Sequence, residues 1–387
     1  MTNFYYHIPT DIYFGKGQIS ALGERLPTLG RHILLVYGGG SIKRSGLYEC
    51  VCAELHRADI EWEEIAGVEP NPRIQTVRRG AAICREKKID VVLAVGGGST
   101  IDCAKMVAAA ACYDGDAWDL VLDGSKVEKA LPVVSVLTLA ATGSEMDGFS
   151  VISNYEKNEK WVSSSELYKP RFSIMDPEYT FSVPAYQTAC GASDIISHTL
   201  ENYFNTERGA YLQARMAEGI LKTCIHYAPI AIAEPDNYEA RANLMWASSM
   251  AINGVVRYGE MTAWSVHPME HELSAFYDIT HGAGLALLTP YWMEQVLGDE
   301  TIWRFVEYGV NVWGISSEKK PYAIAQEAIA KTREFFVSLG MPSHLSELGI
   351  DDTKFDIMAE KAARVINGRG FAPMSAEIVR SIYARAL

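Results

Sequence analysis

The spacing of hydrophobic and polar residues divides the chain into two parts with different periods. Up to about residue 184, short β-branched runs alternate with amphipathic stretches, and the runs lie at 32–37, 61–65, 90–95, 131–138 and 171–176. Such runs predict buried strands, and the amphipathic stretches between them, as at 46–56, predict helices. Strand–loop–helix repetition of this kind predicts a Rossmann-like α/β domain with a mostly parallel sheet.

After residue 184 the hydrophobic period becomes that of helices. Longer segments rich in Ala, Leu, Met and Glu follow one another at 210–233, 236–254, 262–276, 321–339 and 353–366. Apolar residues that recur every three to four positions predict α-helices. We therefore predict an α/β domain over residues 1–184 and an all-helical domain over 185–387, and we expect a functional site where two such domains meet.

Composition and charge narrow the class of protein. The chain has 387 residues, of which 48% are hydrophobic and 21% charged, and its formal net charge is −13. This acidity argues against nucleic acid or an anionic membrane as the main partner. No apolar run is long enough to predict a membrane span, and the N-terminus lacks the pattern of a secretory signal. Seven scattered cysteines without a CxxC pair are typical of reduced thiols, so we predict a cytoplasmic protein.

The strands at 32–37 and 90–95 each run into the same glycine motif. The first loop contains Gly38, Gly39, Gly40 and Ser41, and the second Gly96, Gly97, Gly98 and Ser99. Glycines let a backbone approach a phosphate, and the amides at a helix start favour an anion. One such loop is more often only a tight turn, but two predict a dinucleotide site although neither fits G-x-G-x-x-G. Asp102, on the first turn of the second helix, would accept hydrogen bonds from a hydroxyl or stabilise the helix start.

The first loop favours NADP(H) over NAD(H). It carries no acidic residue that would hold a ribose diol, and Gly39 leaves space beside Ser41, Lys43 and Arg44. Uncharged space next to cations suits a 2′-phosphate. A third loop, TLAATGSE at 138–145, follows another predicted strand and offers hydroxyls and a flexible backbone beside a flat ring.

Acidic residues and histidines at helical spacing predict a metal site in the second half. Asp194 and His198 are four residues apart and therefore share a helix face; His267 and His271 repeat this spacing, and His281 follows in DITHGAG. One such pair alone is more often an ordinary helix-surface contact. Five candidates in three clusters instead favour a divalent cation such as Fe²⁺ or Zn²⁺. The spacing leaves open which of these histidines bind it.

Other functions fit parts of this pattern. His267, Glu270 and His271 spell the H-x-x-E-H of a class of metallopeptidases, with the glutamate as general base. That interpretation explains neither glycine loop, and Pro268 predicts a helix start there rather than a helix interior. A glycerol dehydrogenase or a sugar-phosphate cyclase is a competing enzyme, but a cyclase would place several Lys or Arg near these motifs, where the chain has few. A non-catalytic nucleotide- or metal-sensing protein would not need an open metal site.

Taken together, the motifs resemble the iron-dependent (group III) alcohol dehydrogenases, particularly the branch of NADPH-dependent butanol dehydrogenases and aldehyde reductases. The likeness spans nearly the whole chain and rests on the two GGGS loops, FGKG at 14–17, TGSE at 142–145, DxxxH at 194–198 and HPMEHELSAFYDITHGAGLA at 267–286. It implies a dehydroquinate-synthase-like architecture and reversible hydride transfer between NADP(H) and small aldehydes or primary alcohols. It also implies a homodimer, to which an N-terminal strand over 4–15 would contribute.

The resemblance also implies roles for single residues. The implied metal ligands are Asp194, His198, His267 and His281. The implied cofactor-binding residues are Gly38, Gly39, Gly40, Ser41, Gly96, Gly97, Gly98, Ser99, Asp102, Thr138, Thr142 and Lys160. His271 would lie near the active site without binding metal, as a candidate proton relay, and Glu270 would be structural. Members restricted to NAD(H) carry Asp in place of Gly39. Met146 and Asp147 replace the Asn common after GSE, so the resemblance does not extend to substrate-side contacts there.

Overall fold

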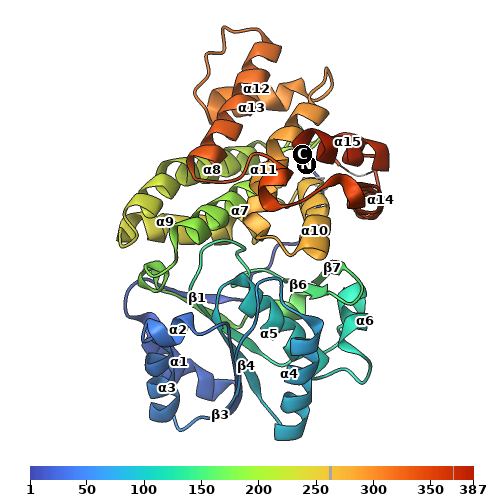
Figure 1. The fold of residues 1–387 in the computed structure, drawn as a ribbon. Helices are drawn as coiled ribbons and strands as arrows, with labels where there is room; N and C mark the ends of the chain where they lie inside the picture. The colour runs from blue at the N-terminus through green and yellow to red at the C-terminus, as the bar shows by residue number, and fades with distance from the viewer. Residues whose placement is uncertain (261–263, 369) are drawn as a thin grey trace. The chain divides into compact units, whose positions relative to one another are not determined.

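A computed structural model describes residues 1–260, 264–368 and 370–387, which form two compact units (Figure 1). The α/β unit comprises His7–Val183 and Pro235–Ser249. The helical unit comprises Met1–Tyr6, Pro184–Glu234 and Met250–Leu387. The division after Val183 lies next to the predicted boundary at residue 184. However, residues 1–6 belong to the helical unit and residues 235–249 belong to the α/β unit, which a single boundary in the sequence cannot describe.

The α/β unit is built on a sheet of six parallel strands in the order β1-β8-β5-β4-β2-β3. In that order the strands are β1 (Asp11–Phe14), β8 (Phe172–Met175), β5 (Val133–Leu137), β4 (Val91–Gly96), β2 (His32–Tyr37) and β3 (Glu61–Ile65). Five of them coincide with the predicted runs, because a central strand of a parallel sheet is buried on both faces and forms a continuous apolar segment. The prediction of a Rossmann-like α/β fold is confirmed.

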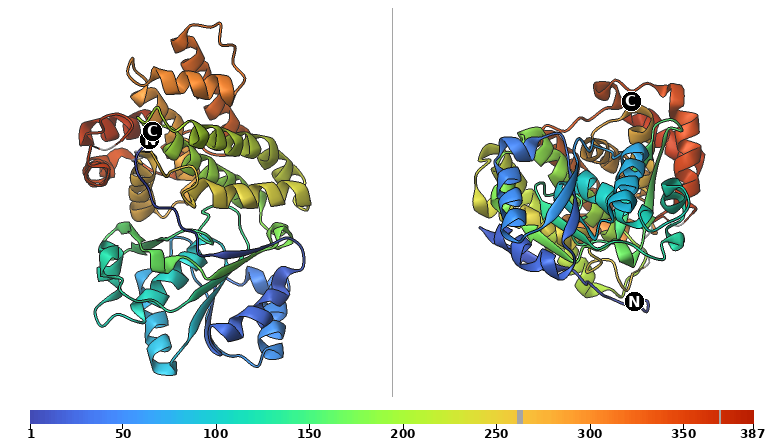
Figure 2. Two further views of the ribbon diagram at one scale, coloured as in Figure 1. Left: turned by 180° about the vertical axis from the view of Figure 1, so that it is seen from behind. Right: turned by 90° about the horizontal axis from the view of Figure 1, so that it is seen from below.

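Helices cover both faces of this sheet (Figures 1 and 2). One face carries α1 (Ala21–Arg25) and α3 (Leu47–Arg57), and the other carries α4 (Ile74–Lys87), α5 (Gly98–Ala110) and α6 (Ala117–Leu122). Neighbouring residues of β2 alternate between the two cores: Ile33 packs with the α3 side and Leu34 with the α5 side. The short helix α2 (Ser41–Arg44) follows the first glycine loop.

The α/β unit also contains an antiparallel hairpin that the sequence does not predict, formed by strands β6 (Phe149–Asn154) and β7 (Glu159–Ser164). Helix α9 (Tyr238–Ile252) matches the helix predicted at 236–254, but its residues up to Ser249 belong to the α/β unit and not to the helical unit. Short 3₁₀ helices lie at Gln18–Ser20, Leu26–Thr28, Gly124–Lys126, Glu166–Tyr168, Pro177–Thr180, Leu345–Leu348 and Asp352–Lys354.

The helical unit contains α7 (Ala185–Tyr203), α8 (Tyr211–Ala233), α10 (Val266–Tyr277), α11 (His281–Val296), α12 (Ile302–Asn311), α13 (Pro321–Ser338), α14 (Phe355–Ile366) and α15 (Ala376–Ala386). The helices predicted at 210–233, 321–339 and 353–366 are confirmed, and the first residues of the one predicted at 262–276 lie outside the described residues. An aromatic cluster centred on Phe204 joins several helices, with Trp292, Phe305 and Tyr308 around it.

The N-terminal strand is shorter than predicted. The sequence predicts a strand over 4–15, but only Asp11–Phe14 pairs with the sheet. Residues 1–6 belong instead to the helical unit, where the rings of Phe4 and Tyr6 pack against Tyr258. Pro9 has no N–H to donate, which disfavours a continuous strand through this segment.

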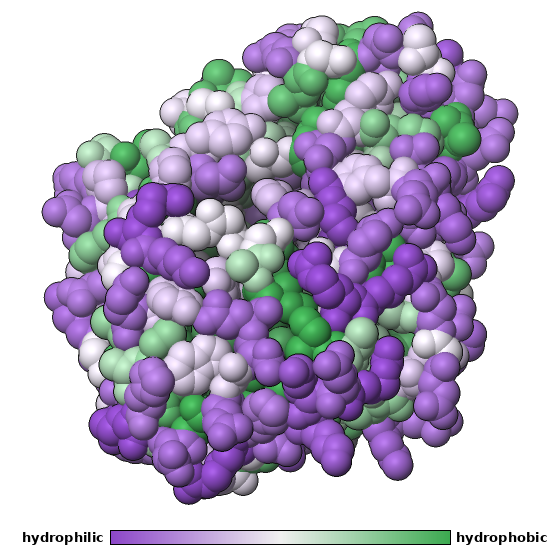
Figure 3. Space-filling view, turned by 60° about the horizontal axis from the view of Figure 1, so that its bottom comes forward, coloured by the Kyte–Doolittle hydropathy of each residue, from purple (hydrophilic) through white to green (hydrophobic). Residues whose placement is uncertain are grey.

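The surface and the cysteines agree with the composition. On the face shown in Figure 3, hydrophilic side chains cover most of the surface and apolar ones form small groups between them. All seven cysteines are free. Among the described residues, every helix is too short or too polar to cross a lipid bilayer.

Candidate metal centre

Helix α7 contributes three acidic or imidazole side chains to one buried face. Asp194, His198 and Glu201 follow one another at intervals of four and three residues, so they project from the same side of the helix. Their exposed fractions are 3%, 5% and 3%. Buried groups of this kind need partners, because an unpaired polar or charged atom in the interior is costly.

Helices α10 and α11 contribute the remaining histidines. His267 lies on the first turn of α10, next to Pro268, so the predicted helix start is confirmed. Asp278, in the left-handed conformation with φ 51°, ends α10, and His281 is the first residue of α11. The two helix starts therefore present His267 and His281 from separate elements.

The glycines after His281 allow the helices to pack this closely. A Cβ atom on Gly282 would lie 2.1 Å from the carbonyl oxygen of Cys190 on α7. A Cβ on Gly284 would lie 2.8 Å from Cγ of Glu270 on α10. The sequence HGAG thus brings the backbone of α11 against both neighbouring helices and carries His281 with it.

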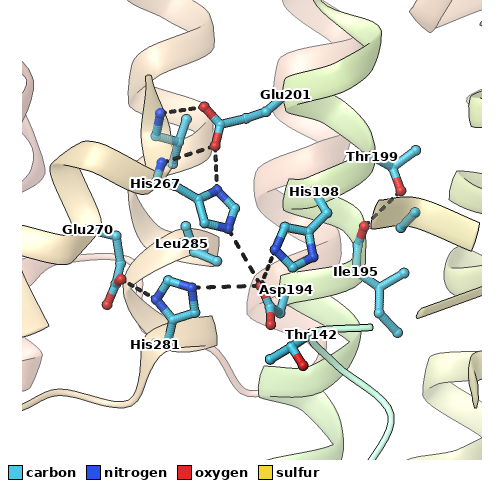
Figure 4. Close-up of polar contacts among 12 residues, drawn as sticks. Thr142, Asp194, Ile195, His198, Thr199, Glu201, His267, Glu270, His281 and Leu285 are labelled. Carbon is cyan, nitrogen blue, oxygen red and sulfur yellow. Dashed lines mark hydrogen bonds and ion pairs between the residues drawn. The ribbon is translucent and has the colours of Figure 1, made fainter. Parts of the chain in front are cut away.

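The three histidines converge on one oxygen of Asp194 (Figure 4). The Nε2 atoms of His198, His267 and His281 lie 3.4, 3.7 and 3.8 Å from Asp194 Oδ1. Two ligand atoms held by one tetrahedral zinc ion lie about 3.3 Å apart. Two of the observed distances exceed those of hydrogen bonds, so the arrangement resembles the edges of a coordination polyhedron more than a hydrogen-bonded cluster.

Two buried atoms at this point make no hydrogen bond in the described part of the chain. Asp194 Oδ1 and His267 Nε2 have no hydrogen-bond partner among the described residues. Ligand atoms of Asp194, His267 and His281 all lie within 4.8 Å of one another, a grouping typical of a metal site. A divalent cation would satisfy these atoms together, and carboxylate and imidazole are the ligand types that iron and zinc accept. The residues therefore fit the metal that the sequence predicted.

The ionisation of these groups agrees with that fit. Burial lowers the pKa of His198 to about 3, which keeps its imidazole neutral and its lone pair available. Burial also lowers the pKa of His267, but Glu201 and Asp194 outweigh it and raise the pKa to about 9. The two carboxylates thus favour positive charge at His267, and a bound cation supplies that charge while the ring stays neutral.

Two glutamates hold the outer nitrogens of the histidines. Glu201 accepts hydrogen bonds from the backbone amides of Val266, at 2.7 Å, and His267, at 3.0 Å, and also binds Nδ1 of His267. Glu270 binds Nδ1 of His281 and accepts a hydrogen bond from Ser274. Both rings therefore turn Nε2 toward Asp194. Carboxylates commonly orient metal-binding histidines in this way.

Sequence reasoning missed these roles. It did not single out Glu201, and it treated Glu270 as structural. The missed signal for Glu201 is its spacing of three residues from His198, which puts it on the same face of α7. The metallopeptidase interpretation needs Glu270 as a free general base, whereas the structure buries its carboxyl completely and pairs it with His281.

His271 lies beside the candidate ligands. It follows His267 by one helical turn, and its ring centroid is 6.2 Å from that of His267 and 5.6 Å from that of His281. Its side chain is partly exposed, unlike that of His267. This position keeps the ring next to the site and in contact with solvent.

The glycine loops of the α/β unit lie side by side. Strands β2 and β4 are neighbours, with Tyr37 opposite Val95, so both loops follow the carboxyl ends of adjacent strands. The chain continues to β3 on one side and to β5 on the other, and such a reversal is where open α/β sheets bind ligands. A Cβ on Gly39 would meet no atom within 4 Å, whereas one on Gly98 would lie 2.3 Å from Thr142.

The other predicted cofactor residues differ in their surroundings. Thr138 follows β5 and donates its backbone N–H to the carbonyl oxygen of Gly96 at 3.0 Å, next to the second loop. The carboxylate of Asp102 is already bound, to the Ser144 hydroxyl and the Val151 amide. Lys160 is buried on strand β7, opposite Ser153, rather than at the end of a sheet strand.

Comparisons with known proteins agree with this arrangement. The family model described as iron-containing alcohol dehydrogenase matches residues 9–177, and the C-terminal model of the Fe-containing alcohol dehydrogenase family matches 188–387. The NADH-dependent butanol dehydrogenase B of Clostridium acetobutylicum is 55% identical over 100% of both chains. The NADPH-dependent aldehyde reductase YqhD of Escherichia coli is 40% identical over 93% of both chains.

Solved structures give the same result. A crystal structure of NADH-dependent butanol dehydrogenase A from Thermotoga maritima matches with a TM-score of 0.95 and 38% identity, and covers 100% of this chain and 99% of its own. The family models together span nearly the whole sequence, and they match the α/β part and the helical part separately. The chain therefore belongs to the iron-containing alcohol dehydrogenase family and is an alcohol/aldehyde oxidoreductase.

Proposed function

We propose that this chain interconverts small aldehydes and primary alcohols with NADP(H), in preference to NAD(H), and with one divalent metal ion, Fe²⁺ or Zn²⁺. The observation that carries the proposal is the convergence of three histidine Nε2 atoms on one oxygen of Asp194. Aldehyde reduction is the favoured direction. The proposed metal ligands are Asp194, His198, His267 and His281.

The chain's own residues have distinct tasks in this proposal. When bound by Asp194, His198, His267 and His281, a divalent cation would supply Lewis acidity toward a carbonyl oxygen. Glu201 and Glu270 hold the rings of His267 and His281 in the orientation that binds the cation. His271, partly exposed beside them, passes a proton between the alcohol oxygen and water.

The cofactor would be held by the loops of the α/β unit. The proposed contacts come from Gly38–Ser41, Gly96–Ser99, Asp102, Thr138, Thr142 and Lys160. The amides at the start of α5 are suited to a pyrophosphate, because the first N–H groups of a helix have no partner within it. The position of both glycine loops at the strand reversal supports this assignment.

The preference for NADP(H) rests on the surroundings of the first loop. Space is open beside Gly39, and the Lys43 ammonium lies 5.1 and 4.4 Å from the ring centroids of Tyr37 and Tyr48. Both tyrosine hydroxyls donate to Glu64, at 2.7 and 2.5 Å, so this carboxylate is bound by neighbours. Open space after β2 and a cation in the following turn suit a 2′-phosphate, although the Glu64 carboxylate also attracts Lys43 and offsets part of its charge.

The names of the relatives support the proposed substrate class, but they differ in the cofactor that they specify. The names of the relatives from C. acetobutylicum and E. coli specify butanol and aldehydes. The former is called NADH-dependent and the latter NADPH-dependent. The cofactor preference proposed here therefore depends on the chain's own residues, Gly39 and Lys43.

The test is a comparison of kcat/KM for butanal with NADPH and with NADH, together with elemental analysis of the purified protein. We expect a higher kcat/KM with NADPH, loss of activity after chelation, and recovery when Fe²⁺ or Zn²⁺ is restored. An equal or higher value with NADH would overturn the cofactor preference. Activity that survives complete removal of metal would overturn the role of the metal.

We also propose that the chain forms a homodimer. Strand β1 is at the edge of the sheet and pairs on one side with β8, while its other side pairs with no described strand. An exposed strand edge favours pairing with another chain. Light scattering should give twice the mass of one chain, and a monomer would refute this proposal.

A further inference from the structure

We propose that the buried ion pair between Lys105 and Asp147 fixes the turn at 142–147 in the position it needs to meet the cofactor, an inference that rests on the cofactor site proposed above. Lys105 lies on α5 and is fully buried. Its Nζ donates to Asp147 Oδ1 at 2.6 Å, to Ser144 Oγ at 2.8 Å and to the carbonyl oxygen of Phe149 at 2.9 Å. All three hydrogens of the ammonium group are thus used on one segment.

Asp102 holds the same segment from the preceding turn of α5. Its Oδ1 accepts from Ser144 Oγ at 2.5 Å, and its Oδ2 accepts from the Val151 amide at 2.9 Å. Residues three apart on a helix share a face, so Asp102 and Lys105 bind the segment from one side of α5. Ser144 in turn donates its amide to Thr142 Oγ1 at 3.1 Å, which links the network to a proposed cofactor contact.

The turn also packs against the second glycine loop. A Cβ on Gly98 would lie 2.3 Å from Thr142 Oγ1, and one on Gly97 would lie 3.1 Å from Leu139 Cβ. The loop at 138–145 and the start of α5 therefore leave no room between them here. Any shift of the turn would move Thr142 relative to the loop proposed to bind the pyrophosphate.

Stability alone does not explain an ion pair in this place. The two side chains are 0% and 6% exposed, and a buried pair is generally no more stable than apolar side chains of similar volume. The pair instead fixes the orientation of the segment, because Asp147 Oδ1 accepts hydrogen bonds from both Lys105 and the Phe149 amide, the latter at 2.9 Å. Asp147, where the chain departs from the family pattern, is therefore paired with Lys105 of the same chain.

The test uses a double variant that removes both charges at once. Lys105→Met/Asp147→Leu removes both charges of the pair, but it also takes the Lys105 charge away from Asp102 and the acceptor away from the Phe149 amide, so its melting temperature should fall by several degrees. We expect amide exchange over 142–149 to accelerate and the Kd for NADPH, from fluorescence titration of the metal-loaded protein, to rise about tenfold. Asp147→Asn keeps an acceptor for Lys105 and should hold the Kd within about threefold of the wild-type value.

A second ion pair of the same unit provides the matched control. Glu54→Leu/Arg57→Met removes a pair on the surface of α3 and should change neither the exchange over 142–149 nor the Kd. Acceleration of exchange together with weaker NADPH binding in the Lys105/Asp147 double variant would support the proposal.

Three results would overturn it. The first is wild-type exchange over 142–149 in the Lys105/Asp147 double variant, and the second is faster exchange with an unchanged Kd. The third is a double variant too unstable to measure, together with an Asp147→Asn variant in which exchange over 142–149 is faster while the Kd for NADPH is unchanged, since the position of the turn would then not affect the cofactor. Failure of the proposed function would instead appear in the wild type, as absent NADPH-dependent aldehyde reduction, and would leave the exchange measurement intact.

Discussion

Glu201 and Glu270 decide which nitrogen of His267 and His281 is free to bind a metal, because each carboxylate occupies the Nδ1 of its histidine. Replacing Glu270 by Gln weakens that hold and lets the His281 ring turn. Loss of such an outer carboxylate typically lowers metal affinity about 10- to 100-fold. We expect a loss of this size in a titration against a competing chelator.

A neighbouring glutamate on the same helix provides the control for this prediction. Glu272 is also buried, and it pairs with Lys361 at 2.8 Å. Glu272→Gln should therefore bind zinc as the wild type does. Equal zinc affinities for Glu270→Gln and the wild type would show that Glu270 does not orient a ligand.

His271 is close enough to the candidate ligands to exchange protons but is not among the residues that converge on Asp194. A general acid or base contributes about 100-fold or more to a rate, and water replaces part of that contribution when the side chain is removed. His271→Ala should therefore lower kcat about 10- to 100-fold while the metal content stays near that of the wild type. Loss of metal from this variant, measured by elemental analysis, would make His271 a ligand instead.

Glu145 makes the stability of the α/β unit depend on pH. Burial raises the pKa of this carboxyl from 4.5 to about 7, despite a hydrogen bond from Ser249. Because the folded form holds the proton more tightly than the unfolded form, this contribution is fully present below pH 4.5 and is lost as pH rises through 7. The loss amounts to at most about 3 kcal/mol.

Glu145→Gln should reduce that loss. The amide keeps an acceptor for Ser249 and does not titrate, so the free energy of unfolding should fall less between pH 5 and pH 8 (roughly the range over which such a carboxyl ionises) than in the wild type. Some dependence will remain, because burial also raises the pKa of Asp102 to about 6. Urea unfolding at the two pH values measures this difference, and equal slopes would assign the pH dependence to other groups.

At the scale of elements, the sequence predicts those strands and helices whose burial leaves a regular hydrophobic period. It does not predict elements such as α11, where packing against other helices outweighs the intrinsic helix propensity of the residues. Strand β2 is apolar throughout because both of its faces are covered, and its predicted bounds match the observed ones. Helix α11 begins with HGAG, and glycine disfavours helix in isolation, so this start was not predicted. Its glycines are explained by contacts with Cys190 and Glu270, which lie on other helices.

The metal site shows the same limit. Helical spacing identified Asp194 with His198 as one pair and His267 with His271 as another. The structure keeps the first pair and adds His267 and His281 to it from two other helices, while His271 does not converge on Asp194. Spacing within one helix cannot show which residues of separate helices meet, and here the family resemblance supplied the ligand set that the spacing left open.

The close approach of α11 to α7 predicts the effect of a methyl group at their contact. Gly282→Ala would place a Cβ 2.1 Å from the carbonyl oxygen of Cys190, so the helices must separate. Overpacking of this kind typically costs about 1–3 kcal/mol of stability. Because His281 precedes this glycine, the variant should also bind zinc more weakly, which a chelator titration at constant temperature measures.

Gly219→Ala serves as the matched control, because this glycine also lies within a helix, α8, and an added Cβ would meet no atom within 4 Å. Alanine is favoured over glycine in helices by about 1 kcal/mol, so this variant should be as stable as the wild type or more stable. If Gly282→Ala behaves like Gly219→Ala in both stability and zinc affinity, the contact does not position His281.

At the scale of the whole molecule, the two units are not consecutive pieces of chain. Helix α9 belongs to the α/β unit through partners more than a hundred residues away: Trp246 packs against Phe14, Tyr238 lies near Lys16, and Ser249 donates to Glu145. Its hydrophobic period predicts a helix correctly but carries no information on which core it joins. The hydrophobic period can therefore predict the boundary at residue 184 but not the assignment of α9 to the α/β unit.

Because the proposed metal ligands all belong to the helical unit and the proposed cofactor loops all belong to the α/β unit, the two ligands can be tested independently. A ligand that binds only the folded state stabilises it by about 2.7 kcal/mol at a hundredfold excess over its Kd, and it slows amide exchange where it binds. Adding Zn²⁺ to metal-free protein should therefore protect α7 and the first turns of α10 and α11. Adding 2′,5′-ADP, which carries the 2′-phosphate but no nicotinamide, should protect the loop after β2.

The converse pattern, with zinc protecting the glycine loops and leaving α7 unchanged, would refute the assignment of the metal to the helical unit. Protection of α7 in the variant Asp194→Asn as strong as in the wild type would refute the ligand set itself, since the oxygen on which all three histidines converge would then not be needed.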